Sequence, residues 1–153
     1  MKKSTFLLFF LLTFSVGYSQ LKLTSFEQID SLQNIEKRKT IVFIHTYWCQ
    51  YCHAMKSKTL QKPEVVKKLN DKFYFIDFNA EEKRKITFNK HQFQFQPNGT
   101  TSGIHELARQ LGTINNKVTY PTLCILNENH EIIFQHSGFL TTKDLNLILN
   151  KIE

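Results

Sequence analysis

The sequence predicts one α/β domain in which a central mixed sheet is flanked by helices. Short apolar runs typical of buried strands alternate with segments of helical periodicity, and a short turn separates the last two runs. The length of 153 residues leaves room for a single core. A content of 41% hydrophobic and 22% charged residues is typical of a globular chain and argues against disorder.

The first nineteen residues have the pattern of a secretory signal peptide. A basic start is followed by an apolar run from Phe6 to Phe14 and by small residues before a cleavage site expected between Ser19 and Gln20. This run is shorter than the ~20 residues that span a membrane, so no stable membrane insertion is expected. We therefore expect a signal peptide at 1–19, a domain at 20–153, and a mature protein in the periplasm or outside the cell.

The positive charge of the chain identifies no partner. Loss of the leader, with its two lysines, would lower the formal net charge from +7 to +5. The remaining lysines are interleaved with acidic residues, as on solvated helix faces and loops. A nucleic-acid partner is therefore not expected.

The first half of the domain is expected to place a buried strand between helices. Apolar residues recur at helical spacing from Phe26 to Ile35, and Ile41 to Ile44 is a continuous apolar run typical of a strand buried on both faces. The predicted elements, in chain order, are a helix at 24–39, a strand at 40–48, a helix at 49–60, a helical turn from 63 and a strand at 73–78, parallel to the first strand.

The second half is expected to begin with an inserted segment, 80–118. In it, Ile86 and Phe88 should face Phe93 and Phe95 in a hairpin that turns at Asn89–Lys90, and a short helix should cover 104–111. Strands at 123–126 and 132–134 should form an antiparallel hairpin, and a helix at 144–152 should close the domain.

Cys49 and Cys52 carry the predicted chemistry. They lie three positions apart where a buried strand runs into a helix, so they can close a disulfide with little backbone movement. The helix N-terminus favours a thiolate at Cys49, and the thiolate is the form that attacks another disulfide. Cys52, one turn deeper, is placed to resolve the mixed disulfide. We expect a redox-active disulfide that needs no added cofactor or metal.

These residues, together with Tyr120-Pro121-Thr122 ahead of a strand, resemble the thioredoxin superfamily. Three segments (52–55, 63–66 and 73–77) further resemble small exported thioredoxin-like proteins and the C-terminal domain of the bacterial envelope thiol-reductant transporter. The resemblance implies a thioredoxin-like fold with a cis-proline at Pro121 facing the cysteines. It also implies client contacts at Trp48 and Tyr120, thiol- or disulfide-containing envelope partners, and recharging by a membrane thiol reductant.

Two features depart from that family. Phe43 stands six residues before Cys49, where thioredoxin carries a buried acid, so the proton relay attributed to that acid does not carry over. The segment 80–118 is also longer than a typical crossover between strands. We expect this added hairpin to be where the protein differs in partner choice.

Other interpretations of the same residues stay open. Cys49 to His53 matches the c-type haem attachment motif, although Met55, the only methionine after the leader, is badly placed as a second ligand. A non-catalytic binding or chaperone module is another alternative. His53 would either modulate the thiolate or have no special role, and Cys124 is expected to be a small buried residue. Because no histidine lies between the two cysteines, a reductant or shuttle is favoured over a strong oxidant.

Overall fold

The computed structural model describes residues 20–153, and the signal peptide predicted at 1–19 lies outside the described residues. At its centre is a four-stranded sheet in the order β10–β9–β1–β2. β1 (Lys39–His45) pairs in parallel with β2 (Phe73–Asn79) and antiparallel with β9 (Thr122–Leu126), which pairs antiparallel with β10 (Ile132–Ser137). The predicted mixed sheet is confirmed.

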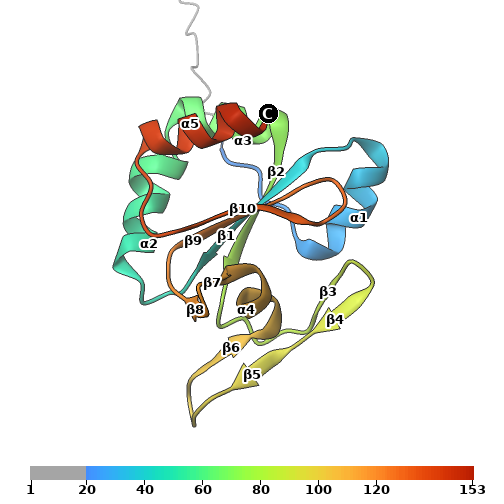
Figure 1. Ribbon diagram of the computed structural model, residues 1–153, viewed down its shortest axis with the longest axis vertical. Coiled ribbons are helices and arrows are strands. Elements are labelled where there is room, and N and C mark those ends of the chain that lie inside the picture. The colour runs from blue at the N-terminus through green and yellow to red at the C-terminus, as the bar shows by residue number, and fades with distance from the viewer. Residues whose placement is uncertain (1–19) are drawn as a thin grey trace, which may run out of the picture.

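Helices cover both faces of this sheet (Figure 1). The first face carries α2 (Gln50–Met55), its continuation η1 (Lys56–Leu60, a π-helix), α3 (Pro63–Lys72) and α5 (Thr142–Ile152). The second face carries α1 (Phe26–Ile35) and α4 (Glu106–Gly112). The predicted α/β class, a central sheet flanked by helices, is therefore confirmed.

β1 separates two hydrophobic cores. Because successive strand side chains point to opposite faces, Ile41 and Phe43 pack in the core that contains both cysteines of the Cys–x–x–Cys segment. Val42 and Ile44 pack in the core beneath α1 and α4. All four side chains are fully buried, as the continuous apolar run predicted.

α1 is shorter than predicted, and its last turn does not face the core. Ile35, expected on the apolar face, is 83% exposed, whereas Gln33 is buried. The amide of Gln33 donates to the carbonyl of Arg38 at 2.6 Å and accepts from its N–H at 3.0 Å. The helix thus ends at Ile35 because the chain turns back into β1, and the turn is held by a polar side chain.

The inserted segment begins with the predicted hairpin. β3 (Ile86–Phe88) pairs with β4 (His91–Phe93), and Phe93 lies opposite Ile86 as expected. Asn89 and Lys90 have φ of 49° and 64°, the left-handed conformation that a two-residue hairpin turn requires.

The expectation that Phe95 belongs to this hairpin is wrong. Phe95 opens β5 (Phe95–Pro97), which pairs with β6 (Gly103–His105), so Ile104 lies in a strand and α4 begins only at Glu106. A side chain at position 103 would meet the Phe95 ring at 2.3 Å, so the two strands approach closely because residue 103 is glycine.

The insertion is fastened to the sheet at its base. The N–H of His105 donates to the carbonyl of Ala80 at 2.7 Å, and the buried His105 ring caps α4 by accepting from the N–H of Leu107. A further short hairpin, β7 (Thr113–Ile114) with β8 (Lys117–Val118), was not predicted. In Figure 1 the β5–β6 hairpin forms the lower end of the molecule, and the β3–β4 hairpin lies at the right, below α1.

The peptide bond between Tyr120 and Pro121 is cis, as the resemblance predicted. Within residues 20–153 no helix is both long and apolar enough to cross a membrane.

Candidate active site

The cysteine pair lies where β1 gives way to α2. Cys49 is the N-cap residue of this helix, and its sulfur accepts the N–H of Cys52 at 3.1 Å. The two residues form a disulfide with their Cα atoms 5.2 Å apart. The strand-to-helix placement predicted for the pair is confirmed. This geometry directs a backbone donor at the Cys49 sulfur, which would stabilise negative charge there after reduction.

Exposed aromatic side chains flank the two cysteines in the sequence. Tyr47, Trp48 and Tyr51 are 71%, 67% and 70% exposed, whereas Cys49 and Cys52 are 5% and 1% exposed. Large apolar groups clustered on a surface typically mark a contact site for another molecule. The rings of Tyr47, Trp48 and Tyr51 therefore form an exposed aromatic surface in the segment that contains the two cysteines.

The two residues predicted to contact clients lie together. The rings of Trp48 and Tyr120 meet edge to face, with centroids 6.0 Å apart. The indole N–H of Trp48 also donates to Glu81 at 3.1 Å, which links the cysteine loop to the start of the insertion. Tyr120 is half-buried against the core that holds both cysteines, and burial raises the pKa of its phenol.

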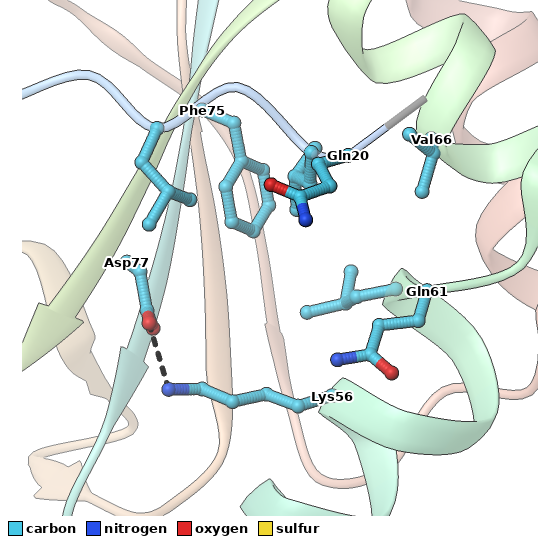
Figure 2. A pocket seen from close by; sticks show the side chains of 9 residues that line it. Gln20, Lys56, Gln61, Val66, Phe75 and Asp77 are labelled. Carbon is cyan, nitrogen blue, oxygen red and sulfur yellow. Dashed lines mark hydrogen bonds and ion pairs between the residues drawn. The ribbon is translucent and has the colours of Figure 1, made fainter. Parts of the chain in front are cut away.

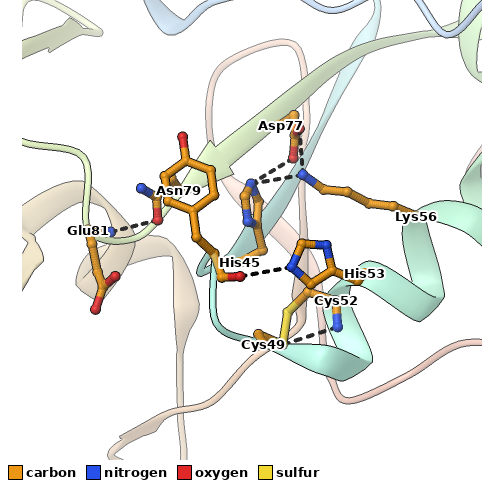
Figure 3. A network of polar contacts seen from close by, with 9 residues as sticks. His45, Cys49, Cys52, His53, Lys56, Asp77, Asn79 and Glu81 are labelled. Carbon is orange, nitrogen blue, oxygen red and sulfur yellow. Dashed lines mark hydrogen bonds and ion pairs between the residues drawn. A yellow bond between two sulfur atoms is a disulfide. The ribbon is translucent and has the colours of Figure 1, made fainter.

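His53 contacts the backbone rather than another side chain. Its Nε2 lies 2.8 Å from the carbonyl oxygen of Tyr47. This contact ties the first turn of α2 to the loop that leads into it, as seen in Figure 3.

Cys124 and the disulfide lie in different hydrophobic cores. Cys124 lies in β9 opposite Val42 and packs in the core beneath α1 and α4, on the other face of the sheet. Burial raises the pKa of its thiol to about 12, so the unreactive neutral form dominates near neutral pH. These observations agree with the predicted role as a small buried residue.

A cluster of three charged or titratable side chains was missed in the sequence. Lys56 Nζ lies 2.7 Å from Asp77 Oδ2 and 3.1 Å from His45 Nε2, while His45 Nε2 lies 3.0 Å from Asp77 Oδ1. Figure 3 shows the cluster near the disulfide. One signal was available: Asp77 interrupts the apolar strand Phe73 to Phe78, as buried acids do when they have partners.

The charge state of Asp77 reflects its neighbours. Burial alone would raise the pKa of this carboxyl, but the contacts from His45 and Lys56 outweigh burial and hold the pKa below its ordinary value. Asp77 is therefore ionised at neutral pH and compensates the charge of Lys56.

No group of three or more histidine, cysteine or acidic side chains in the described part of the chain could hold a metal ion.

The chain belongs to the thioredoxin-like domain family, whose sequence model matches residues 26–153. No curated protein matches it. A fold of this family with a Cys–x–x–Cys pair at disulfide distance supports thiol–disulfide oxidoreductase activity in general. Membership favours that activity over the c-type haem alternative.

Solved structures agree on the fold. A thioredoxin from Thermus thermophilus superposes with a TM-score of 0.62 at 19% identity, over 88% of each chain. A thioredoxin-fold protein from Helicobacter pylori gives 0.58 at 15% identity, over 88% of this chain and 75% of the other. The C-terminal domain of DsbD from Neisseria meningitidis, in its reduced form, gives 0.54 at 14% identity, over 83% and 92%.

Proposed function

We propose that this protein is an exported thiol–disulfide oxidoreductase that reduces or shuttles disulfides of envelope proteins through Cys49 and Cys52. The observation that carries the proposal is the position of Cys49, at the helix N-cap with its sulfur accepting the N–H of Cys52. A sulfur held in this way is favoured as a thiolate once the disulfide is opened. No added cofactor or metal is needed, because the disulfide itself carries the two electrons.

The reaction proceeds in two exchanges. The Cys49 thiolate attacks one sulfur of a client disulfide, which forms a mixed disulfide and releases a client thiolate that takes a proton. Cys52 then loses its proton and attacks the Cys49 sulfur, which closes the Cys49–Cys52 disulfide and releases the second client thiolate. Two electrons have passed to the client. A membrane thiol reductant would then supply two electrons to the Cys49–Cys52 disulfide and regenerate the dithiol.

The surface beside the disulfide suits an extended client segment. Trp48 and Tyr120 would contact the client together, and Pro121 would align its backbone. Support comes from the edge-to-face contact of the two rings and from the exposure of Trp48.

Electron donation is the favoured direction. A strong oxidant has a potential near −120 mV, against about −270 mV for thioredoxin, and an oxidant requires strong stabilisation of its reduced form. Here Gln50 and Tyr51, between the cysteines, supply no cation. We therefore expect a potential more negative than about −180 mV, the value of protein disulfide isomerase.

Insulin reduction with dithiothreitol as the electron source tests the activity. The wild-type protein should accelerate precipitation of the insulin chains, and the Cys49→Ser variant should not. Equal rates for the two proteins would favour the non-catalytic binding module instead. The exposed aromatic surface also suits that alternative. Intact mass of exported material tests the localisation, and a chain beginning at Gln20 is expected.

A further inference from the structure

The cluster of His45, Lys56 and Asp77 lies on the same face of the sheet as the disulfide. Phe43 and Asp77 are register partners in the parallel pair β1–β2, so their side chains point to the same face. His45 follows Phe43 by two residues and shares that face. Phe43 itself packs in the core with Cys49 and Cys52.

Phe43 therefore contacts the cluster and shares one core with both cysteines. Phe43 stacks on the His45 ring with centroids 5.7 Å apart, and Lys56 Nζ lies 5.7 Å from the centre of the Phe43 ring. An aromatic core is weakly polar, so charges at its edge act on groups within it more strongly than charges in bulk water do.

Lys56 is also joined to the cysteines through the helix. Its N–H donates to the carbonyl of Cys52, one turn earlier. At Lys56 the α-helix widens into the π-helix η1, and its carbonyl accepts from the N–H of Gln61, five residues on. Such π segments are rare and often occur at functional sites. Here the segment begins at the residue that supplies the cation.

Two cavities meet at the ion pair between Lys56 and Asp77. One, of about 520 Å³, is shown in Figure 2 with the ion pair beside an apolar wall that includes Phe75 and Val66. The other, of about 220 Å³, is lined by His45 together with the same pair and brings Glu27, Glu82 and Arg84 to its rim. The pair is partly buried between β2 and the cysteine helix, with 31% of the Lys56 and 25% of the Asp77 side chain exposed.

We propose that the pairing of Asp77 with Lys56 sets the reduction potential of the Cys49–Cys52 couple, a role that rests on the proposed function. Reduction places negative charge on Cys49. An unpaired cation at Lys56 would stabilise that charge and make the couple more oxidising, whereas an unpaired anion at Asp77 would have the opposite effect. With both present the field at the sulfur is balanced, and the couple stays reducing. The three residues are positioning residues, since none contacts the reacting sulfur atoms.

Charge-removing variants test this balance, because the two single changes must act in opposite directions. Asp77→Asn should make the couple more oxidising by about tenfold in its equilibrium constant with glutathione, about 30 mV for two electrons. Lys56→Gln should shift it in the reducing direction, the double variant should return near wild type, and Lys56→Arg should retain the wild-type value. A merely structural role predicts shifts of one sign or none.

The exposed pair Lys67–Asp71 on α3 supplies the matched control. Lys67→Gln and Asp71→Asn remove the same charges at a solvated site and should leave the potential unchanged. The alkylation rate of Cys49 by iodoacetamide, after chemical reduction, gives a second readout that needs no client. Asp77→Asn should raise that rate and Lys56→Gln should lower it.

Shifts of the same sign for Lys56→Gln and Asp77→Asn, or shifts no larger than in the controls, would overturn the inference. Wild-type protein that fails to reduce insulin would instead count against the proposed function, and the alkylation rates would still decide the inference. If Asp77→Asn does not fold, the reduction potentials of Lys56→Gln and Lys56→Arg decide the inference: only Lys56→Gln should differ from wild type.

Discussion

Phe43 on β1 and Asp77 on β2 lie side by side, as register partners in a parallel strand pair, on the face of the sheet that carries the disulfide. The ring occupies the position six residues before Cys49 where thioredoxin has its buried acid. The carboxylate in this chain lies one strand away, and it is compensated by a lysine from the cysteine helix. This chain therefore carries a carboxylate on the same face of the sheet as the cysteines, but on the strand next to β1.

The two cysteines should behave differently when either is replaced. Cys49→Ser should abolish exchange, because it removes the sulfur at the helix N-cap. Cys52→Ser should leave that sulfur able to attack but remove the group that resolves the mixed disulfide, so covalent client adducts should accumulate. Non-reducing electrophoresis with mass mapping of the adducts measures this. Adducts on Cys52 in the Cys49→Ser variant alone would reverse the assigned roles.

Cys124 should be inert in the native protein. Because burial raises the pKa of this thiol to about 12, iodoacetamide at pH 8 should label reduced Cys49 and leave Cys124 unlabelled until urea is added. Cys124→Ala should keep insulin reduction within about twofold of wild type, because the thiol lies on the opposite face of the sheet from the disulfide. Native labelling at residue 124 is the result that would contradict the prediction.

The stabilisation that ionised Asp77 provides should be lost in acid. The native pKa of Asp77 lies below the ordinary value of about 3.9, so its contribution is complete above about pH 4 and is lost as pH falls through the lower native pKa. Asp77→Asn should cost about 1.5–3 kcal/mol at pH 7, since the bonds broken involve charges, and should lose less stability than wild type on acidification. Urea unfolding between pH 2 and 7 measures both effects.

Asp71→Asn is the control for that experiment, because its ion pair with Lys67 is exposed and screened by solvent. It should change stability at pH 7 much less than Asp77→Asn does, because an exposed pair gains little from its charges in water. Parallel acid profiles for wild type and Asp77→Asn would show that Asp77 does not contribute as described.

Trp48 should affect client binding more than folding. The side chain is 67% exposed, so Trp48→Ala should change the free energy of unfolding by about 0.5 kcal/mol or somewhat more, given its contacts with Glu81 and Tyr120. KM for a peptide disulfide should rise several-fold. Leu147→Ala, at another exposed apolar residue on α5, should change neither quantity. A large loss of stability without a change in KM would assign Trp48 to packing.

The sequence was informative where structure is local. The apolar run at Ile41–Ile44, the turn at Asn89–Lys90 and the cysteine pair at a strand-to-helix junction each depend on neighbours along the chain, and each is found as predicted. The cis bond before Pro121 was predicted only from resemblance.

Features that depend on distant partners were missed. Phe95 alternates correctly for the first hairpin but pairs with His105, and periodicity cannot choose between two nearby partners. Gln33 looks like a surface residue until the return of the chain at Arg38 is known. The charged cluster depends on the register of β1 with β2, because only that register brings Asp77 beside Phe43.

The hydrogen bond from His105 to Ala80 closes the inserted segment at its base and leaves the turn at 98–102 far along its own hairpin. The paired strands β5 and β6 hold the two ends of that turn together. Lengthening the turn therefore adds only loop-closure entropy, about 0.6 kcal/mol for each doubling of its length. We therefore expect the tip to accept foreign sequence, such as an epitope or a fluorescent reporter, without disturbing the sheet. Ala80, at the base of the insertion, precedes Glu81, which accepts a hydrogen bond from the Trp48 indole. A reporter inserted at the turn 98–102 would therefore be connected through the base of the insertion to the loop that carries Cys49.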